Sequence, residues 1–131
     1  DQITYMLNWM YAPKELNRQL ENGHSFFFLR DNQVEIGFCG LEENYPEKGL
    51  LRIHKIYLKP EFHGKGLGKL MLRKIEELAQ ERNLVGLHLN VNRFNSAVIF
   101  YEKAGFIPTS KEDIDIGNGY LMKDYVMQKK L

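Results

Sequence analysis

The chain has 131 residues, of which 44% are hydrophobic and 27% are charged, and its formal net charge is +1 at pH 7. This size fits one globular domain that buries about two thirds of its extended-chain surface. The near-neutral charge gives no field for nucleic acid or an anionic membrane, and no apolar run approaches the roughly 20 residues that span a bilayer. The one cysteine, Cys39, cannot form an internal disulfide, which favours a cytoplasmic location.

The first half of the chain predicts two helices followed by three strands. The spacing of apolar residues indicates short helices over 2–10 and 13–22. A phenylalanine-rich strand over 24–30 and its antiparallel partner over 34–41 come next. An apolar strand then covers residues 50–58.

The second half predicts one crossover between parallel strands. A helix from Gly66 to Arg82 has its apolar residues at helical spacing on one face. The strand over 84–91 follows this crossover helix and is therefore predicted to run parallel to strand 50–58. The remaining segments are a helix that Asn95 caps and that ends at Gly105, and two final strands over 106–113 and 119–128. This order predicts an α/β fold, with a mixed sheet and helices on both of its faces.

A glycine-rich loop, Phe62-His63-Gly64-Lys65-Gly66-Leu67-Gly68-Lys69, lies between strand 50–58 and the helix that follows it. The first backbone N–H groups of a helix have no partner within the helix and point at any anion in front of them. Glycine lets the backbone approach such a ligand and adopt positive φ, and two lysines add positive charge. The loop therefore predicts a ligand that carries phosphate groups.

The spacing excludes two common phosphate motifs. A P-loop has Ser or Thr after its Gly-Lys pair, whereas Leu70 follows Gly68-Lys69 here and His63 stands at the first glycine position. The dinucleotide fingerprint G-x-G-x-x-G fails because its third glycine position, counted from Gly64, holds Lys69. The pattern that remains is x-x-G-x-G at a strand–loop–helix junction.

A second motif, N-S-A-V-I-F-Y-E-K-A-G-F, runs from Asn95 to Phe106. With the glycine loop it resembles the GNAT superfamily of N-acetyltransferases, whose cofactor loop Gln/Arg-x-x-Gly-x-Gly/Ala matches His63 to Gly68 except at its first position. The family strand R-I-Y-V-x-P is similar to residues 55–60, and the family segment N-x-A-x-x-x-Y-E-K-x-G-F matches 95–106. The resemblance covers residues 24–131.

The resemblance implies the GNAT-like acyl-CoA N-acyltransferase fold, a mostly antiparallel mixed sheet with one splayed parallel strand pair and helices on both faces. It implies a single N-acetyltransferase domain over 1–131 in which the family's first strand and helix are missing at the N-terminus. The implied reaction moves an acetyl group from acetyl-CoA directly to a primary amine of a small molecule or peptide. It needs no metal, nucleic acid or membrane, and a homodimer is compatible with it.

The resemblance also assigns residues to the cofactor. The pyrophosphate is expected on the loop backbone, and the thioester against the strand end, where the Leu58 N–H can bond the acetyl carbonyl. Tyr101 aligns with the family tyrosine at the CoA sulfur and is the implied general acid, with packing on the sheet as the alternative. Asn95 aligns with an asparagine on the CoA arm, with a simple helix cap as the alternative. The implied cofactor-binding residues are Ile56, Tyr57, Leu58, His63, Gly64, Lys65, Gly66, Leu67, Gly68, Lys69, Asn95 and Tyr101.

The residue that accepts the amine proton is left open. Some family members have a glutamate on the strand entering the loop, and Arg52 stands at the nearest position here. Residues 52, 54 and 56 are expected to share a face of the strand. His54 is therefore the candidate base, with a hydrogen-bonded structural histidine as the alternative and Glu42, Glu43 or water as other candidates.

Other features have two readings each. His63 replaces the family's glutamine or arginine, and its ring either contacts phosphate or is solvated in the loop. The acidic run 112–115, placed in the loop of the last hairpin, is a solvated face or attracts a cationic amine. The histidines and Cys39 lack metal-ligand spacing. A silent acyl-CoA-binding module of the same fold is the alternative function, and a nucleotide-acting domain is disfavoured by the missing Ser/Thr.

Overall fold

The structure is a computed structural model that describes residues 7–11, 24–31 and 34–131. Its strands are β1 (Leu7–Tyr11), β2 (His24–Asp31), β3 (Val34–Glu43), β4 (Leu50–Leu58), β5 (Gly86–Asn92), β6 (Ile107–Gly117) and β7 (Tyr120–Lys130). Its helices are the short 3₁₀ helix η1 (Pro60–Phe62) and the α helices α2 (Leu67–Glu81) and α3 (Ala97–Lys103).

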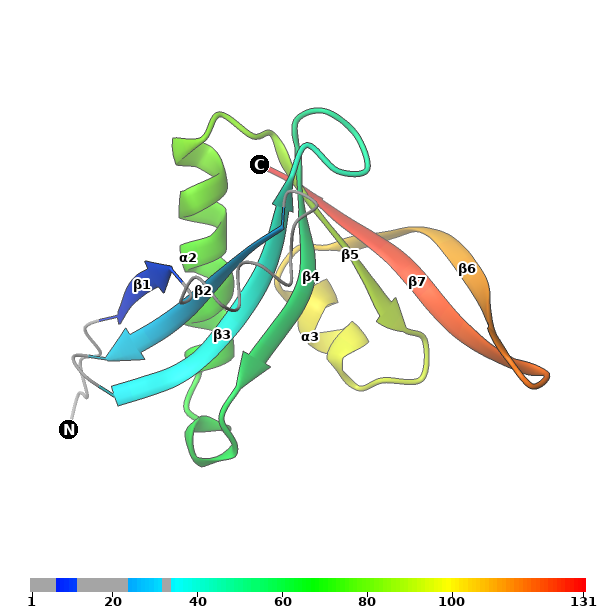
Figure 1. Cartoon of the computed structure of the whole chain (residues 1–131), viewed down its shortest axis with the longest axis horizontal. Coiled ribbons are helices and arrows are strands. Elements are labelled where there is room, and N and C mark those ends of the chain that lie inside the picture. The colour runs from blue at the N-terminus through cyan, green and yellow to red at the C-terminus, as the bar shows by residue number, and fades with distance from the viewer. Residues whose placement is uncertain (1–6, 12–23, 32–33) are drawn as a thin grey trace.

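The described strands form one sheet in the order β1-β2-β3-β4-β5-β7-β6 (Figure 1). Only β4 and β5 pair in parallel; the other neighbours are antiparallel. Helix α2 makes the crossover between the parallel strands, as the alternation of strand and helix predicted. The mixed sheet with one parallel pair is therefore confirmed.

Two boundaries differ from the sequence-based prediction. The helix expected over 2–10 is wrong at its C-terminal half, because β1 pairs with β2 from Leu7↔Asp31 to Tyr11↔Phe27. An open sheet edge satisfies the backbone groups of this short segment, and that outweighs a weak helical spacing. The helix expected over 13–22 lies outside the described residues. In the last hairpin, positive φ at Asn118 and Gly119 closes a tight turn, so β6 and β7 are longer than predicted.

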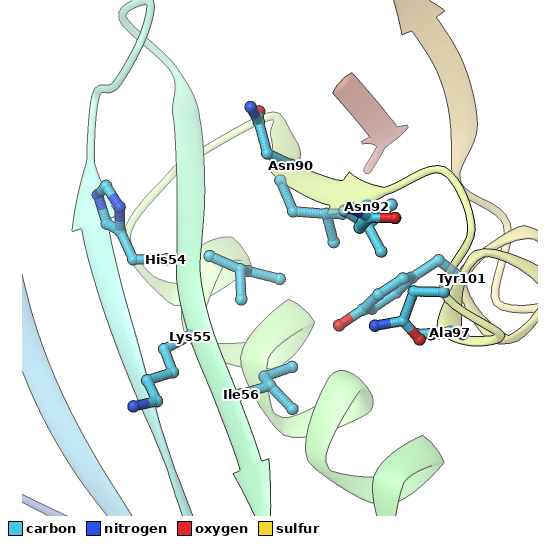
Figure 2. Close-up of a pocket in the computed structure, with 11 residues that line it drawn as sticks. His54, Lys55, Ile56, Asn90, Asn92, Ala97 and Tyr101 are labelled. Carbon is cyan, nitrogen blue, oxygen red and sulfur yellow. Dashed lines mark hydrogen bonds between the residues drawn. The ribbon is translucent and has the colours of Figure 1, made fainter. Parts of the chain in front are cut away.

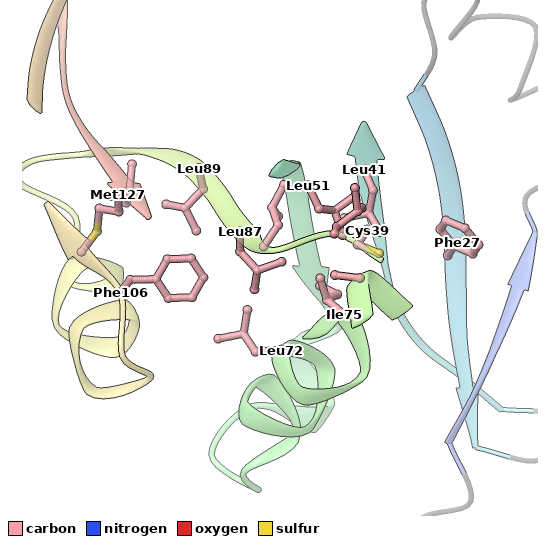
Figure 3. Packing of buried hydrophobic residues seen from close by; sticks show 14 of the residues in the cluster. Phe27, Cys39, Leu41, Leu51, Leu72, Ile75, Leu87, Leu89, Phe106 and Met127 are labelled. Carbon is pink, nitrogen blue, oxygen red and sulfur yellow. The ribbon is translucent and has the colours of Figure 1, made fainter. Parts of the chain in front are cut away.

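The described helices pack against one face of the sheet, which we call the helix face. Leu72 and Ile75 of α2 belong to a core cluster with Phe106 and with strand residues such as Leu51 and Leu87 (Figure 3). Val98 of α3 belongs to the same cluster. The opposite side of the sheet is called the second face below.

A β-bulge at His54 changes which β4 residues share a face. Strand β3 pairs Gly40 with Lys55 and then Leu41 with Ile53, so His54 has no partner in the register. Ile53 is buried in the helix-face core and Ile56 packs against it. The expectation that residues 52, 54 and 56 share a face is therefore wrong, because the inserted residue shifts the alternation of side chains.

The end of β4 is packed closely against β3 at Gly37. A Cβ at this position would lie 2.1 Å from the Tyr57 carbonyl oxygen and 3.1 Å from Leu58 Cα. Gly37→Ala is expected to lower the free energy of unfolding by about 3 kcal/mol, because only backbone could move away. Gly40→Ala on the same strand is the control, since its Cβ would meet the Phe26 ring at 3.4 Å. Urea denaturation of both variants measures the difference, and equal stabilities would contradict the expectation.

Candidate active site

The parallel strands separate beyond the pair Ile53↔Leu89, and a pocket of about 330 Å³ occupies the opening between them (Figure 2). Its walls come from β4, β5 and the start of α3. The lining residues are Ile53, His54, Lys55, Ile56, Leu89, Asn90, Val91, Asn92, Asn95, Ala97 and Tyr101. The apolar strand residues among them belong to the helix face, whereas Lys55, Asn90 and Asn92 belong to the second face. The pocket is thus bordered by side chains from both faces of the sheet.

The backbone at the end of β4 points into this opening. The Lys59 N–H donates to the Ile36 carbonyl on β3 at 2.9 Å. Successive residues of a strand direct their N–H and C=O groups to opposite edges, so the Leu58 N–H is turned away from β3 and towards the gap. This is the orientation that a donor to the acetyl carbonyl requires.

The ring of His63 folds back onto the same strand end. Its Nε2 lies 2.8 Å from the Leu58 carbonyl oxygen, and a carbonyl only accepts, so Nε2 carries the hydrogen. In the neutral ring Nδ1 then has a lone pair and cannot donate to a phosphate. The Leu58–Lys59 peptide is therefore held from both sides, by His63 and by Ile36, a role that neither sequence-based alternative for His63 included.

The glycine loop has the geometry of an anion cradle. Gly64 and Gly66 have φ of 76° and 75°, and a Cβ at either would meet nothing within 4 Å. Gly66 is the N-cap of α2, a helix of 15 residues, and the first N–H groups of such a helix have no partner within it. This backbone fits a pyrophosphate.

The third glycine of the loop has a different role. A Cβ at Gly68 would lie 3.4 Å from the Phe100 ring, so this residue lets α2 and α3 approach each other. A side chain here would therefore contact the Phe100 ring of α3. Lys69 lies beside Phe100 in a small surface groove that also contains Lys103, whereas the Lys65 ammonium lies 5.9 Å from the centre of the Phe62 ring.

Tyr101 reaches the pocket from α3. In Figure 2 its hydroxyl points across the pocket towards Ile56 on β4. The ring packs edge-on against Phe106, with centroids 5.5 Å apart. Burial raises the pKa of the Tyr101 phenol above its ordinary value, so the hydroxyl keeps its proton at neutral pH.

Asn95 lies at the start of α3 and at the edge of the pocket. Its Oδ1 accepts the Ala97 N–H at 2.8 Å at the start of α3, but the N-cap position is held by Ser96 and not by Asn95 as predicted. The same side chain lines the pocket. Because its oxygen is engaged by the helix, its amide NH₂ is the group that it can offer to a ligand.

His54 lines the pocket but does not face Tyr101. Its Nε2 lies 2.8 Å from Glu42 Oε1 on β3, and Figure 2 shows the ring on the β3 side of β4, away from the tyrosine. The bulge described above explains this orientation. The structure thus brings Tyr101, Ile56 and Asn95 together and turns the His54 ring towards Glu42.

Sequence reasoning missed a polar network on the second face. Arg52 NH1 lies 3.1 Å from His88 Nδ1 and 3.1 Å from Asn90 Oδ1. Burial, followed by the charge of Arg52, lowers the pKa of His88 to about 4, so His88 is neutral and accepts this hydrogen bond. The alternation of His88, Asn90 and Asn92 with apolar residues on β5 was the signal that could have revealed the network.

The acidic run 112–115 is not in a loop, as had been expected, but within β6. Asp113 pairs with Arg93, and Asp115 Oδ1 accepts the Gly117 N–H at 2.8 Å.

Burial raises the pKa of the Cys39 thiol to about 12, which makes it unreactive. Among the described residues no group of three or more His, Cys, Asp or Glu could hold a metal ion, and no helix is long and apolar enough to cross a membrane.

A splayed parallel strand pair beside a glycine loop at a helix start defines a class of acyl-CoA-dependent transferase folds. A family model described as "Acetyltransferase (GNAT) domain" matches residues 22–108. The chain belongs to the GNAT acetyltransferase family.

Two relatives that are named for their acetyltransferase activity are similar over most of the chain. A spermidine N(1)-acetyltransferase of Thermoplasma acidophilum is 35% identical, covering 96% of this chain and 76% of the relative. A ribosomal protein bS18-alanine N-acetyltransferase of Haemophilus influenzae is 30% identical, covering 94% and 77%. The PaiA N-acetyltransferase of T. acidophilum, solved in complex with coenzyme A, has a TM-score of 0.64 and 28% identity, covering 88% and 66%. The chain spans 47% of the length of an uncharacterized N-acetyltransferase of Methanocaldococcus jannaschii that is 30% identical.

Proposed function

We propose that the protein transfers the acetyl group of acetyl-CoA to a primary amine by direct attack, without a covalent enzyme intermediate. The observation that carries this proposal is the pocket between β4 and β5, which has the Tyr101 hydroxyl on one wall and residues 53–56 of β4 on the other. The names of two relatives give spermidine and the alanine of a ribosomal protein as acceptors, which supports an amine as the substrate.

The residues divide the work between binding and proton transfer. The backbone of Gly64 to Lys69 and the start of α2 hold the pyrophosphate. Acetyl-CoA supplies an activated acyl group, and the Leu58 N–H stabilises the negative charge that develops on its carbonyl oxygen. A C–N bond forms as the C–S bond breaks, and Tyr101 gives its proton to the departing sulfur.

The amine proton needs an acceptor, and the orientation of the His54 ring bears on whether His54 is this base. Its ring is hydrogen-bonded to Glu42 and turned away from Tyr101, which supports the structural alternative for His54, with Glu42, Glu43 and water as the other candidates. We therefore expect His54→Ala to lower kcat/KM by less than about 10-fold and to retain the acidic limb of the pH–rate profile.

A steady-state pH profile of His54→Ala, measured beside that of the unmodified protein, tests this expectation. Loss of the acidic limb together with a fall of about 100-fold in kcat/KM would make His54 the general base.

A silent acyl-CoA-binding module remains the second candidate, and the His54 orientation is the observation that favours it. Release of free thiol from acetyl-CoA with a panel of small amines and peptides separates the two functions. Amine-dependent release above background supports the transferase. Tight CoA binding in calorimetry without any release supports the binding module.

A further inference from the structure

Two carboxylates stand opposite one another on the second face, on the β6–β7 hairpin. Glu112 and Asp124 are partners in the strand register. Both accept from the same donor, since Asn90 Nδ2 lies 3.0 Å from Glu112 Oε2 and 3.4 Å from Asp124 Oδ2. Like charges directly opposite each other across two strands are destabilising, and one neutral amide compensates neither of them.

Asp124 makes this arrangement more costly because it is buried. The residue is only 3% exposed. Its Oδ1 atom is buried and has no hydrogen-bond partner among the described residues. Arg52, the cation of this network, donates to His88 and to the Oδ1 atom of Asn90. It makes no hydrogen bond to either carboxylate among these contacts. A buried carboxylate without a compensating partner is unfavourable, so the pair is suited to bind a cation.

The pair adjoins the second-face wall of the pocket. Asn90 and Asn92 both line the pocket. Asp124 is the register partner of Asn92 and bonds Asn90. The two carboxylates are therefore direct neighbours of the pocket-lining residues on the second face.

We propose that Glu112 and Asp124 bind an ammonium group of the acceptor other than the one that is acetylated, so that the acceptor is a diamine or polyamine. This proposal rests on the transferase function above. The reacting nitrogen must be neutral, whereas two carboxylates stabilise the protonated form of an amine. A second, non-reacting ammonium is therefore the group that fits them.

The test compares two amines that differ only at one end, n-butylamine and 1,4-diaminobutane. The unmodified protein is expected to turn over the diamine with a kcat/KM at least about 10-fold higher. Asp124→Asn and Glu112→Gln are expected to reduce this ratio to within about twofold of one. Asp113→Asn is the matched control, because it removes a neighbouring charge that pairs with Arg93, and it should keep the full ratio.

Thermal melting establishes that each variant is folded. If Asp124→Asn does not fold, Glu112→Gln decides the matter, because Glu112 is exposed and its amide keeps the shape of the side chain. An unchanged ratio in folded Glu112→Gln overturns the proposal. So does equal use of the two amines by the unmodified protein.

Calorimetry of 1,4-diaminobutane binding to the CoA-saturated protein separates this proposal from the transferase function. Binding that both variants weaken, without turnover of any amine, would leave the cation site standing and remove the transferase function. Turnover of n-butylamine without a preference for the diamine, or turnover of peptide amines alone, would leave the transferase function and overturn the cation site.

Discussion

Tyr101→Phe is expected to lower kcat about 100-fold and to leave the affinity for CoA unchanged. The substitution keeps the ring and its edge-on contact with Phe106, and it removes only the hydroxyl that points across the pocket. Because burial raises the pKa of this phenol, the acid is protonated throughout the neutral range. The unmodified protein should therefore lose activity at high pH only above the ordinary tyrosine pKa of about 10.

Tyr125→Phe is the matched control for this prediction. Tyr125 packs against the same helix-face core but does not line the pocket, so its hydroxyl should be dispensable for kcat. Tyr101→Phe should also cost no more than about 1.5 kcal/mol in the free energy of unfolding, the scale of one hydrogen bond. Full kcat in Tyr101→Phe with a good amine acceptor would reduce the tyrosine to a packing residue.

Gly66→Val is expected to weaken CoA binding by at least about 100-fold, measured by calorimetry. Gly66 has φ of 75° at the N-cap of α2, and a Cβ there would stand in the open space in front of the helix. A β-branched side chain is strained at positive φ, and it would also occupy the place of the pyrophosphate.

Two further variants separate these causes. Gly117→Val places the same side chain at a φ of 95° in the β6–β7 turn, far from the loop in sequence, and should bear the strain without losing affinity for CoA. Asparagine tolerates positive φ better than valine does. Gly66→Asn should therefore be less strained and should still weaken CoA binding through its side chain. Unchanged affinity in folded Gly66→Val would exclude the loop as the phosphate site.

Local sequence determined the elements around the cofactor site. The apolar spacing from Leu67 to Leu78 predicted α2, because one face of a helix must be buried. The parallel pairing of β4 with β5 followed from the crossover helix. The glycines at 64 and 66 predicted positive φ, since this backbone conformation is costly for other residues.

The orientation of the candidate site was decided by tertiary structure. Side-chain alternation in β4 depends on its register with β3, and the bulge at His54 that shifts this register has no local signal in the sequence. Segment 7–11 became a strand because the edge of β2 was available to pair with it.

The sequence by itself determined the glycine loop, the parallel strand pair and the motif that carries Tyr101, because each depends on backbone conformation or periodicity within one short segment. Only the tertiary structure placed Glu112 and Asp124 beside Asn90, because residues from three strands must pair before their charges meet. It also turned the His63 ring onto the Leu58 carbonyl and the His54 ring towards Glu42. Contacts of this kind are set by strand order and register, and neither can be read from a single segment.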